Sequence, residues 1–220
     1  MKQFIPLLVF SVFFWSCSPK SKETSTREPR LSHEARFTTF NIEDFSAIKI
    51  NVDLGRLKLT LRQYDHPKME VHKSYQKYVR FEPKGDTLRI YTENTPKSTE
   101  DLEVKKYINL FLPKLNYLET SVSRVTLESF DTPRLSVVNN SSALRLYDCR
   151  IKDLRIENQG LSNIQLDGNN YVDTIYLKNN EKSHLNSNAM VLKTFTLESK
   201  TLDNLNFTNV PENGFIWRKD

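Results

Sequence analysis

From Phe37 onward, apolar side chains alternate with polar or charged ones, which is the pattern of a β-strand with one buried face. Before residue 113 this alternation occurs in the segments FSAIKINV, GRLKLTLRQ, KMEVHKS, TLRIYTE and KYINLFLP. No segment keeps apolar residues at helical spacing for three turns. The pattern therefore predicts an all-β domain with few helices.

Two apolar pairs then recur with a common period of about twenty residues. The first pair recurs at steps of 19, 21 and 20 residues, as Leu135/Val137, Leu154/Ile156, Ile175/Leu177 and Phe195/Leu197. The second recurs about ten residues out of phase, as Val125/Leu127, Leu144/Leu146, Ile164/Leu166 and Leu205/Phe207, and Leu185 stands alone at the fourth place, followed by Ser187. Such a period without a helical segment indicates a β-solenoid, with coils of about 20 residues whose strands stack in parallel register. The earlier strands would lead into these repeats.

Polar residues keep the same period. One set follows the first pair, namely Asn139, Asn158, Asn179 and Ser199, and another precedes the second, namely Ser123, Ser142, Ser162, Ser183 and Asp203. Stacked Asn side chains can hydrogen-bond from coil to coil, and Asn and Ser also close turns. In this register Ile164 should stack in the core on Leu144 and Leu185, and Gln165 should point outward.

The N-terminus, MKQFIPLLVFSVFFWSCSPK, has one lysine, an apolar run from Phe4 to Trp15, and then Ser16 and Cys17. A run of twelve residues is too short to span a bilayer but fits a secretory signal. The end of this segment resembles a bacterial lipoprotein leader, which implies a signal peptide over residues 1–16 and lipidation of Cys17. The alternative is an ordinary cleaved signal peptide. Residues 17–36 would then be the lipidated cysteine and a disordered tether.

The remaining chain, residues 37–220, is expected to form a single domain, with the repeats at about 115–208. The tail, residues 209–220, contains the apolar residues Phe215, Ile216 and Trp217 after Pro211 and Gly214. Because an open end of stacked strands exposes edges and core, we interpret this tail as a cap. The alternative is an exposed aromatic motif for a partner.

The net charge of +5 comes mainly from the N-terminal region, and residues 113–220 are balanced. The best candidate for a basic patch is Lys73–Lys84, KSYQKYVRFEPK, with aromatic residues interleaved. We interpret it as a strand and turn with solvated lysines, and a contact with a lipid headgroup or an anionic polymer is the alternative. No nucleic-acid partner is expected.

Candidate catalytic chemistry is sparse. Apart from Cys17, Cys149 is the only cysteine, so it has no disulfide partner, and a structural role is favoured over a catalytic thiol. Asp148 and Asp167 each follow a second pair, and both are interpreted as turn residues. His66 and His72 could meet across a bend, but two histidines without a third ligand make a weak metal site. His33 and His184 are scattered elsewhere, so we expect no metal and no cofactor.

The segments NNSSALRL, NQGLSNIQL and NEKSHLN resemble the S-G-x-S-[DN]-V repeat of the GIN domain, a family of autotransporter adhesin heads frequent in Bacteroidetes lipoproteins. The resemblance covers roughly residues 40–208. It implies a right-handed parallel β-helix, an extracytoplasmic location and no catalytic activity. The family offers no functional residues that can be carried over.

The sequence thus predicts a non-enzymatic lipoprotein of the cell envelope, attached by its lipid to a bacterial membrane, the outer one by preference. Because CSPKSKE lacks acidic residues directly after the cysteine, a periplasm-facing domain is preferred over a surface-exposed one. A glycan or protein would bind an outward face, whose positions are Ser136, Arg155, Tyr176 and Thr196, or Arg145, Gln165, Asn186 and Asn206. The alternative function is a β-helical lyase or glycosidase that acts on polysaccharide.

Overall fold

Two nine-stranded sheets account for almost all of the chain that the structure describes. The structure is a computed structural model that describes residues 36–51, 57–94, 107–121, 124–140, 143–159, 163–167, 169–179, 183–188, 190–200, 205–208 and 213–219. The predicted signal peptide, Cys17 and the tether up to residue 35 lie outside these ranges, as do Ser123, Ser142, Ser162 and Asp203. The prediction of an all-β domain is confirmed.

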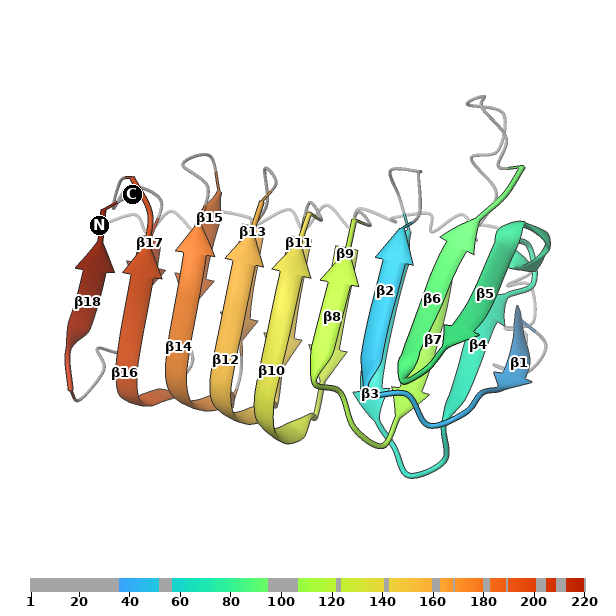
Figure 1. The fold of residues 1–220 in the computed structure, drawn as a ribbon, viewed down its shortest axis with the longest axis horizontal. Helices are drawn as coiled ribbons and strands as arrows, with labels where there is room; N and C mark the ends of the chain where they lie inside the picture. Colours follow the sequence, from blue (N-terminus) through green and yellow to red (C-terminus); the bar gives the residue numbers. More distant parts are fainter. Residues whose placement is uncertain are drawn as a thin grey trace, which may run out of the picture. The chain divides into compact units, whose positions relative to one another are not determined.

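Sheet A has the strand order β1-β4-β7-β3-β9-β11-β13-β15-β17. Its strands, in that order, are Phe37–Asn41, Lys68–His72, Tyr107–Leu112, Lys58–Gln63, Arg124–Glu128, Ala143–Tyr147, Asn163–Asp167, His184–Ser187 and Leu205–Phe207. Sheet B has the order β18-β16-β14-β12-β10-β8-β2-β6-β5 and faces the viewer in Figure 1. Its strands are Phe215–Arg218, Met190–Glu198, Tyr171–Asn179, Arg150–Asn158, Asp131–Asn139, Tyr117–Thr120, Ala47–Asn51, Thr87–Thr92 and Val79–Lys84.

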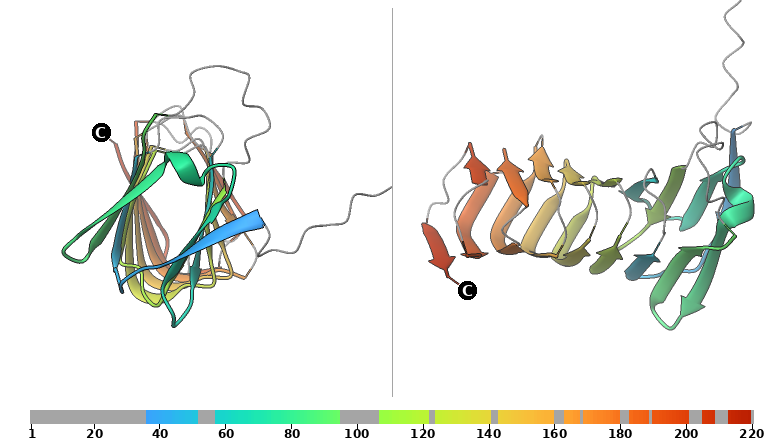
Figure 2. Two further views of the ribbon diagram at one scale, coloured as in Figure 1. Left: turned by 90° about the vertical axis from the view of Figure 1, so that its right-hand side faces the viewer. Right: turned by 90° about the horizontal axis from the view of Figure 1, so that it is seen from above.

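The sheets are mixed, but parallel pairing predominates. Three antiparallel pairs, β1–β4, β4–β7 and β5–β6, lie at the edges formed by the N-terminal strands. A short 3₁₀ helix, η1 (Gln76–Tyr78), precedes β5. The two sheets face each other (Figure 2). The buried hydrophobic residues of both sheets form a single cluster.

From β8 to β18, called here the repeat region, strands that follow one another along the chain alternate between the two sheets. Each strand pairs in parallel with the strand about twenty residues away, so the register predicted from the apolar pairs is confirmed. In sheet B, Leu154 pairs with Leu135 and Ile175. In sheet A, Ile164 pairs with Leu144 and Leu185, and all three are buried.

The strands β2 and β3, called here the inserted pair, break this sequential order. β2 lies between β8 and β6, and β3 lies between β9 and β7 (Figure 1). Ile50 on β2 therefore pairs with Ile90 and with Thr120, 40 and 70 residues away. The N-terminal strands do lead into the repeats, but the strands that adjoin β8 and β9 come from the inserted pair and not from the preceding β7.

The predicted column of Asn side chains is present in sheet B. Asn139 Nδ2 donates to Asn158 Oδ1 at 2.8 Å, and Asn158 Nδ2 donates to Asn179 Oδ1 at 2.9 Å. All three side chains are buried, and Ser199 continues the column at 2% exposure. A buried amide is costly unless it is hydrogen-bonded. The column therefore satisfies its own polar groups from strand to strand and fixes the register of neighbouring strands.

Candidate functional site

The outward residues of the repeat region are the best place to look for a binding site, because the inward residues are sealed in the core. A groove of about 340 Å³ lies on the outward face of sheet B. It is lined by Arg134, Ser136, Asp153, Leu154, Arg155, Thr174 and Tyr176. Three of the four outward positions predicted for this sheet therefore lie in the groove. The fourth, Thr196, is only 9% exposed.

Arg155 and Tyr176 form the most structured contact in this groove. They pair directly in the register of β12 and β14, and the Arg155 guanidinium lies 5.0 Å from the centre of the Tyr176 ring. On the neighbouring strand β10, Ser136 pairs with Arg155, and its short side chain leaves a depression in this part of the face. The arrangement places a planar cation and an aromatic ring beside a hollow, which suits contacts with a ligand that has both apolar and polar groups.

The hydroxyl of Tyr176 is held by an acidic side chain. It donates a hydrogen bond to Glu198, whose other carboxylate oxygen accepts from Lys178 Nζ at 2.7 Å. This bond to an anion, together with partial burial, raises the pKa of Tyr176 above its usual value. The ring is therefore neutral at physiological pH, and its orientation is fixed by the β16 side chain.

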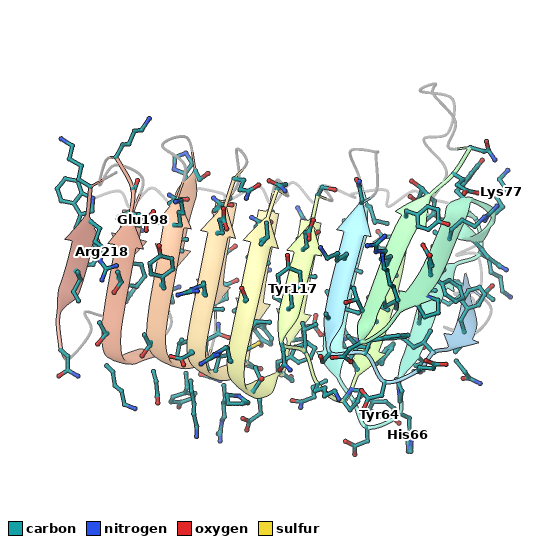
Figure 3. All side chains as sticks on the ribbon, in the orientation of Figure 1. Tyr64, His66, Lys77, Tyr117, Glu198 and Arg218 are labelled. Carbon is teal, nitrogen blue, oxygen red and sulfur yellow. The ribbon has the colours of Figure 1, made fainter. Side chains whose placement is uncertain are left out.

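A second tyrosine stands on the same face near the boundary with the inserted pair (Figure 3). Tyr117 donates its hydroxyl to Glu119 at 2.9 Å, and Glu119 also accepts from Lys49 Nζ at 2.6 Å. Burial and the adjacent carboxylate raise the pKa of Tyr117 to about 12. Lys49 lowers the pKa of Glu119 below its usual value. The face therefore carries preorganised aromatic and charged groups at several neighbouring strands.

On sheet A the predicted outward residues also lie in register. Arg145 pairs with Gln165, and Gln165 pairs with Asn186, so the prediction that Gln165 points outward beside them is confirmed. Asn206 pairs with Asn186 and extends the row to β17. This row is polar and mixed, and Arg145 alone carries a charge in it.

The two aspartates that we considered as carboxylate catalysts have structural partners. Asp148 adopts a left-handed turn with φ of 51° and accepts a hydrogen bond from the Asn169 backbone N–H at 3.3 Å, so its predicted turn role is confirmed. Asp167 is instead the last residue of β13, and its carboxylate accepts from Arg145 Nε. The prediction that Asp167 is a turn residue is wrong, because the strand continues one residue further than the apolar pair indicates.

The two candidate metal-binding histidines do not meet. His66 precedes β4 and contacts the ring of Tyr64 (Figure 3). His72 ends β4, and its Nδ1 lies 2.8 Å from Ser74 Oγ. The extended β4 strand separates them, which overturns the idea that they approach across a bend. Within the described ranges, no three His, Cys, Asp or Glu side chains are grouped so that they could hold a metal ion.

The candidate basic patch, Lys73–Lys84, forms a turn, η1 and the edge strand β5. Its aromatic residues are not presented as a row: Tyr75 is fully buried, and only Phe81 is clearly exposed, at 38%. Burial raises the pKa of Tyr75 to about 12. Arg80 forms an ion pair with Glu93 at 3.2 Å. This is the strand and turn that the sequence predicts.

Cys149 is a buried residue in the turn between β11 and β12 and forms no disulfide. Burial raises the pKa of its thiol, which disfavours the reactive thiolate. The backbone N–H of Cys149 donates to Asn170 Oδ1 at 2.8 Å, and Asn170 Nδ2 donates to the Leu146 carbonyl at 2.9 Å. Sequence reasoning missed Asn170, although an Asn directly before a strand is a common turn signal.

The tail within the predicted cap forms β18, which pairs in parallel with β16. Phe215 stacks on Phe195 at 5.5 Å, and Trp217 pairs with Leu197, so the two residues are a further copy of the first apolar pair. The twenty-residue step from Phe195 and Leu197 was the signal that could have identified them. Phe215, Ile216 and Trp217 remain 40%, 44% and 42% exposed.

Solved structures of two putative adhesins are similar to this chain. A putative adhesin from Bacteroides fragilis is 12% identical, with a TM-score of 0.53, over 82% of this chain and 95% of that one. A putative adhesin from Parabacteroides merdae is 13% identical, with a TM-score of 0.44, over 85% and 95% of the two chains. No curated protein matches the sequence. No helix in the described ranges is long and apolar enough to cross a membrane.

The match to a family model is more informative than these structural likenesses, which at such low identity concern the fold alone. The model described as "putative auto-transporter adhesin, head GIN domain" matches residues 44–204. This range contains the inserted pair and the strands from β4 to β16. Because the match spans most of the chain, the protein belongs to the GIN domain family of adhesin-like heads.

Proposed function

We propose that this protein is a non-enzymatic, adhesin-like binding domain of the bacterial cell envelope that winds as a right-handed parallel β-helix. Membership of the adhesin-head family supports the binding role. Alternation of strands between two sheets, with pairing at about twenty residues, supports the winding. The ligand is a glycan or a protein that contacts an outward face.

The observation that carries this proposal is the groove formed by Arg155, Tyr176 and Ser136. Arg and Tyr are enriched among residues that dominate binding energy, because they combine large contact areas with directional polar groups. In this groove both side chains are held on strands, so little conformational entropy is lost when a ligand binds.

Binding can be tested with the full-length chain in detergent against arrays of bacterial and host glycans and of envelope proteins. Replacing Tyr176 by Ala and Arg155 by Gln should weaken binding of any ligand found by about tenfold or more, since each is an anchor of the groove. The control is Arg218→Gln, which removes a cation from β18 on the same sheet. If the variant with Tyr176 and Arg155 replaced binds as tightly as the Arg218→Gln control, the role of this groove is contradicted.

Lipid attachment through Cys17 is part of the proposal. The short apolar segment before WSC supports it, and two or three acyl chains hold a protein firmly at a membrane. Cells fed labelled palmitate should label the protein, and Cys17→Ala should abolish the label. The domain should resist external protease on intact cells because it faces the periplasm. Labelling of the alanine variant would exclude the anchor, and external degradation would place the domain on the surface.

A further inference from the structure

A second groove, on the outward face of sheet A, has a different chemistry. It has a volume of about 420 Å³ and is lined by Lys58, Leu59, Thr60, Tyr107, Arg124, Thr126, Ala143, Leu144, Arg145, Asn163 and Gln165. The sequence does not group these residues, because they come from β3, β7, β9, β11 and β13. The register brings Lys58 beside both Arg124 and Tyr107.

The hollow has a simple steric origin. Ala143 precedes Leu144, which pairs with Val125, so Ala143 lies next to Arg124 along the outward row. On its other side Ala143 pairs with Asn163. A methyl group between two longer side chains leaves a depression, with the Arg124 guanidinium on one side and the Asn163 amide on the other.

The groove has an excess of positive charge. It is lined by three cations, Lys58, Arg124 and Arg145, and by no Asp or Glu, and the strands of sheet A carry three carboxylates in all. Each of the three carboxylates pairs with a cation other than Lys58 and Arg124: Glu70 with Lys68, Glu128 with Arg62 and Asp167 with Arg145. In the described part of the chain, no carboxylate forms an ion pair with Lys58 or Arg124.

The position of Lys58 is also defined. Its Nζ lies 5.3 Å from the centre of the Tyr107 ring, which holds an ammonium group without neutralising it. Neighbouring strands are about 4.8 Å apart, so Lys58 on β3 and Arg124 on β9 present adjacent cations along the groove.

We propose that the sheet A groove binds an acidic polysaccharide, with Lys58 and Arg124 contacting its anionic groups. This inference rests on the proposed binding function and names the ligand class for this face. Carboxylate or sulfate groups match the two cations. The hydroxyls of Thr60 and Thr126 and the amides of Asn163 and Gln165 match the hydroxyl groups of sugar rings.

The same lining argues against a nucleic acid. Single strands bind to a series of aromatic side chains on which successive bases stack, with a basic groove that follows the backbone. Tyr107 is the only aromatic residue among those that line the groove. Neutral hydrogen-bonding groups make up more of the lining than cations do, which favours a hydroxyl-rich polymer with spaced charges.

The test measures binding of the full-length chain in detergent to polygalacturonate and to its methyl ester, which has the same backbone without the charges. The acidic polymer should bind, the ester should bind at least about tenfold more weakly, and salt should weaken the difference. The double variant Lys58→Gln/Arg124→Gln should reduce affinity for the acidic polymer by about tenfold or more.

The matched control is Lys114→Gln/Arg218→Gln, which removes the same charge from two residues outside the groove and should retain binding. All four side chains are at least partly exposed, so the thermal midpoints of both double variants should stay close to that of the parent. Equal losses of affinity in the two double variants would overturn the assignment of the groove as the binding site, because only the net charge of the protein would then matter.

Two further probes separate the ligand classes. If oligo-dT or polyglutamate binds as tightly as polygalacturonate and depends equally on Lys58 and Arg124, the assignment to polysaccharide is overturned. If the chain binds another glycan or protein while ignoring polygalacturonate, this inference fails and the proposed function stands. If no ligand of any class binds, the proposed function fails as well.

Discussion

The repeat region and the inserted pair contribute to the same core, but their strands pair across very different sequence separations. In the repeat region each strand pairs with strands about twenty residues away, as Ile156 does with Val137 and Leu177. In the inserted pair, Ile50 pairs with residues 40 and 70 positions away. Burial is the same in both, since Ile50 and Ile156 are 2% and 1% exposed. The difference lies in the chain entropy that must be lost before contacts form, which grows with loop length.

A charge placed in either part of the core should unfold the whole domain if the two regions share it. Ile164→Asp in the repeat region and Leu61→Asp in the inserted pair each bury an unpaired carboxylate, and each should cost about 4 kcal/mol or more. Denaturant unfolding followed by circular dichroism measures this. The control Gln165→Asp should cost under about 0.5 kcal/mol. Tolerance of Leu61→Asp would mean that the inserted pair is not part of the common core.

The Asn column distinguishes the two regions chemically. It runs from Asn139 through Asn179, whereas the residues in register beyond it are Thr120 on β8 and Ile50 on β2. Asn158→Ala removes two inter-strand hydrogen bonds and should cost about 1–3 kcal/mol. The more exposed Asn186→Ala should change the free energy of unfolding by under about 0.5 kcal/mol. Similar losses would show that the column adds nothing specific to the repeat region.

Folding kinetics should sharpen the comparison further. Ile156→Val and Ile50→Val each remove one buried methyl group and should destabilise by about 1 kcal/mol. Because contacts close in sequence form first, Ile156→Val should mainly slow folding and Ile50→Val should mainly speed unfolding. Stopped-flow rates across a range of urea concentrations measure both effects. The reverse assignment would indicate that the inserted pair nucleates the fold.

The smallest effect is expected at the ion pair that joins the two regions. Lys49 on β2 contacts Glu119 on β8 at 2.6 Å, and both side chains are partly exposed. A double-mutant cycle with Lys49→Gln and Glu119→Gln should give a coupling of about 0.2–1 kcal/mol that weakens with salt.

The pH dependence of this coupling follows from the lowered pKa of Glu119 in the folded state. The stabilisation is fully present above the unfolded pKa, which is 4.5, and is lost as the pH falls through the lower folded value. Thermal unfolding of the four proteins of the cycle between pH 3 and 7 measures it. A coupling that persists at the lowest pH would mean that the pair is not ionic.

The local pattern of apolar and polar residues predicted those features of the fold that depend on short sequence separations. Alternation located the strands, and the twenty-residue step placed Ile164 on Leu144 and Leu185. The position of β2 between β8 and β6 has no such signal, because any parallel strand of similar alternation satisfies the same burial. The sheet A groove was unpredictable for the same reason, since Lys58 and Arg124 become neighbours only through the inserted pair. Arg155 and Tyr176 were identifiable as outward, but their stacking depends on rotamers.

The buried Cys149 gives the protein a built-in reporter of its own opening. The sequence has two cysteines, so in a Cys17→Ala chain Cys149 is the sole thiol. Its Sγ is directed at the carbonyls of Leu127 and Tyr147, at 3.7 and 3.4 Å, and its side chain has no exposed surface. A thiol reagent can therefore modify it only when the turn between β11 and β12 separates from its neighbours. The labelling rate then measures how often the middle of the repeat region opens, and no engineered probe is needed.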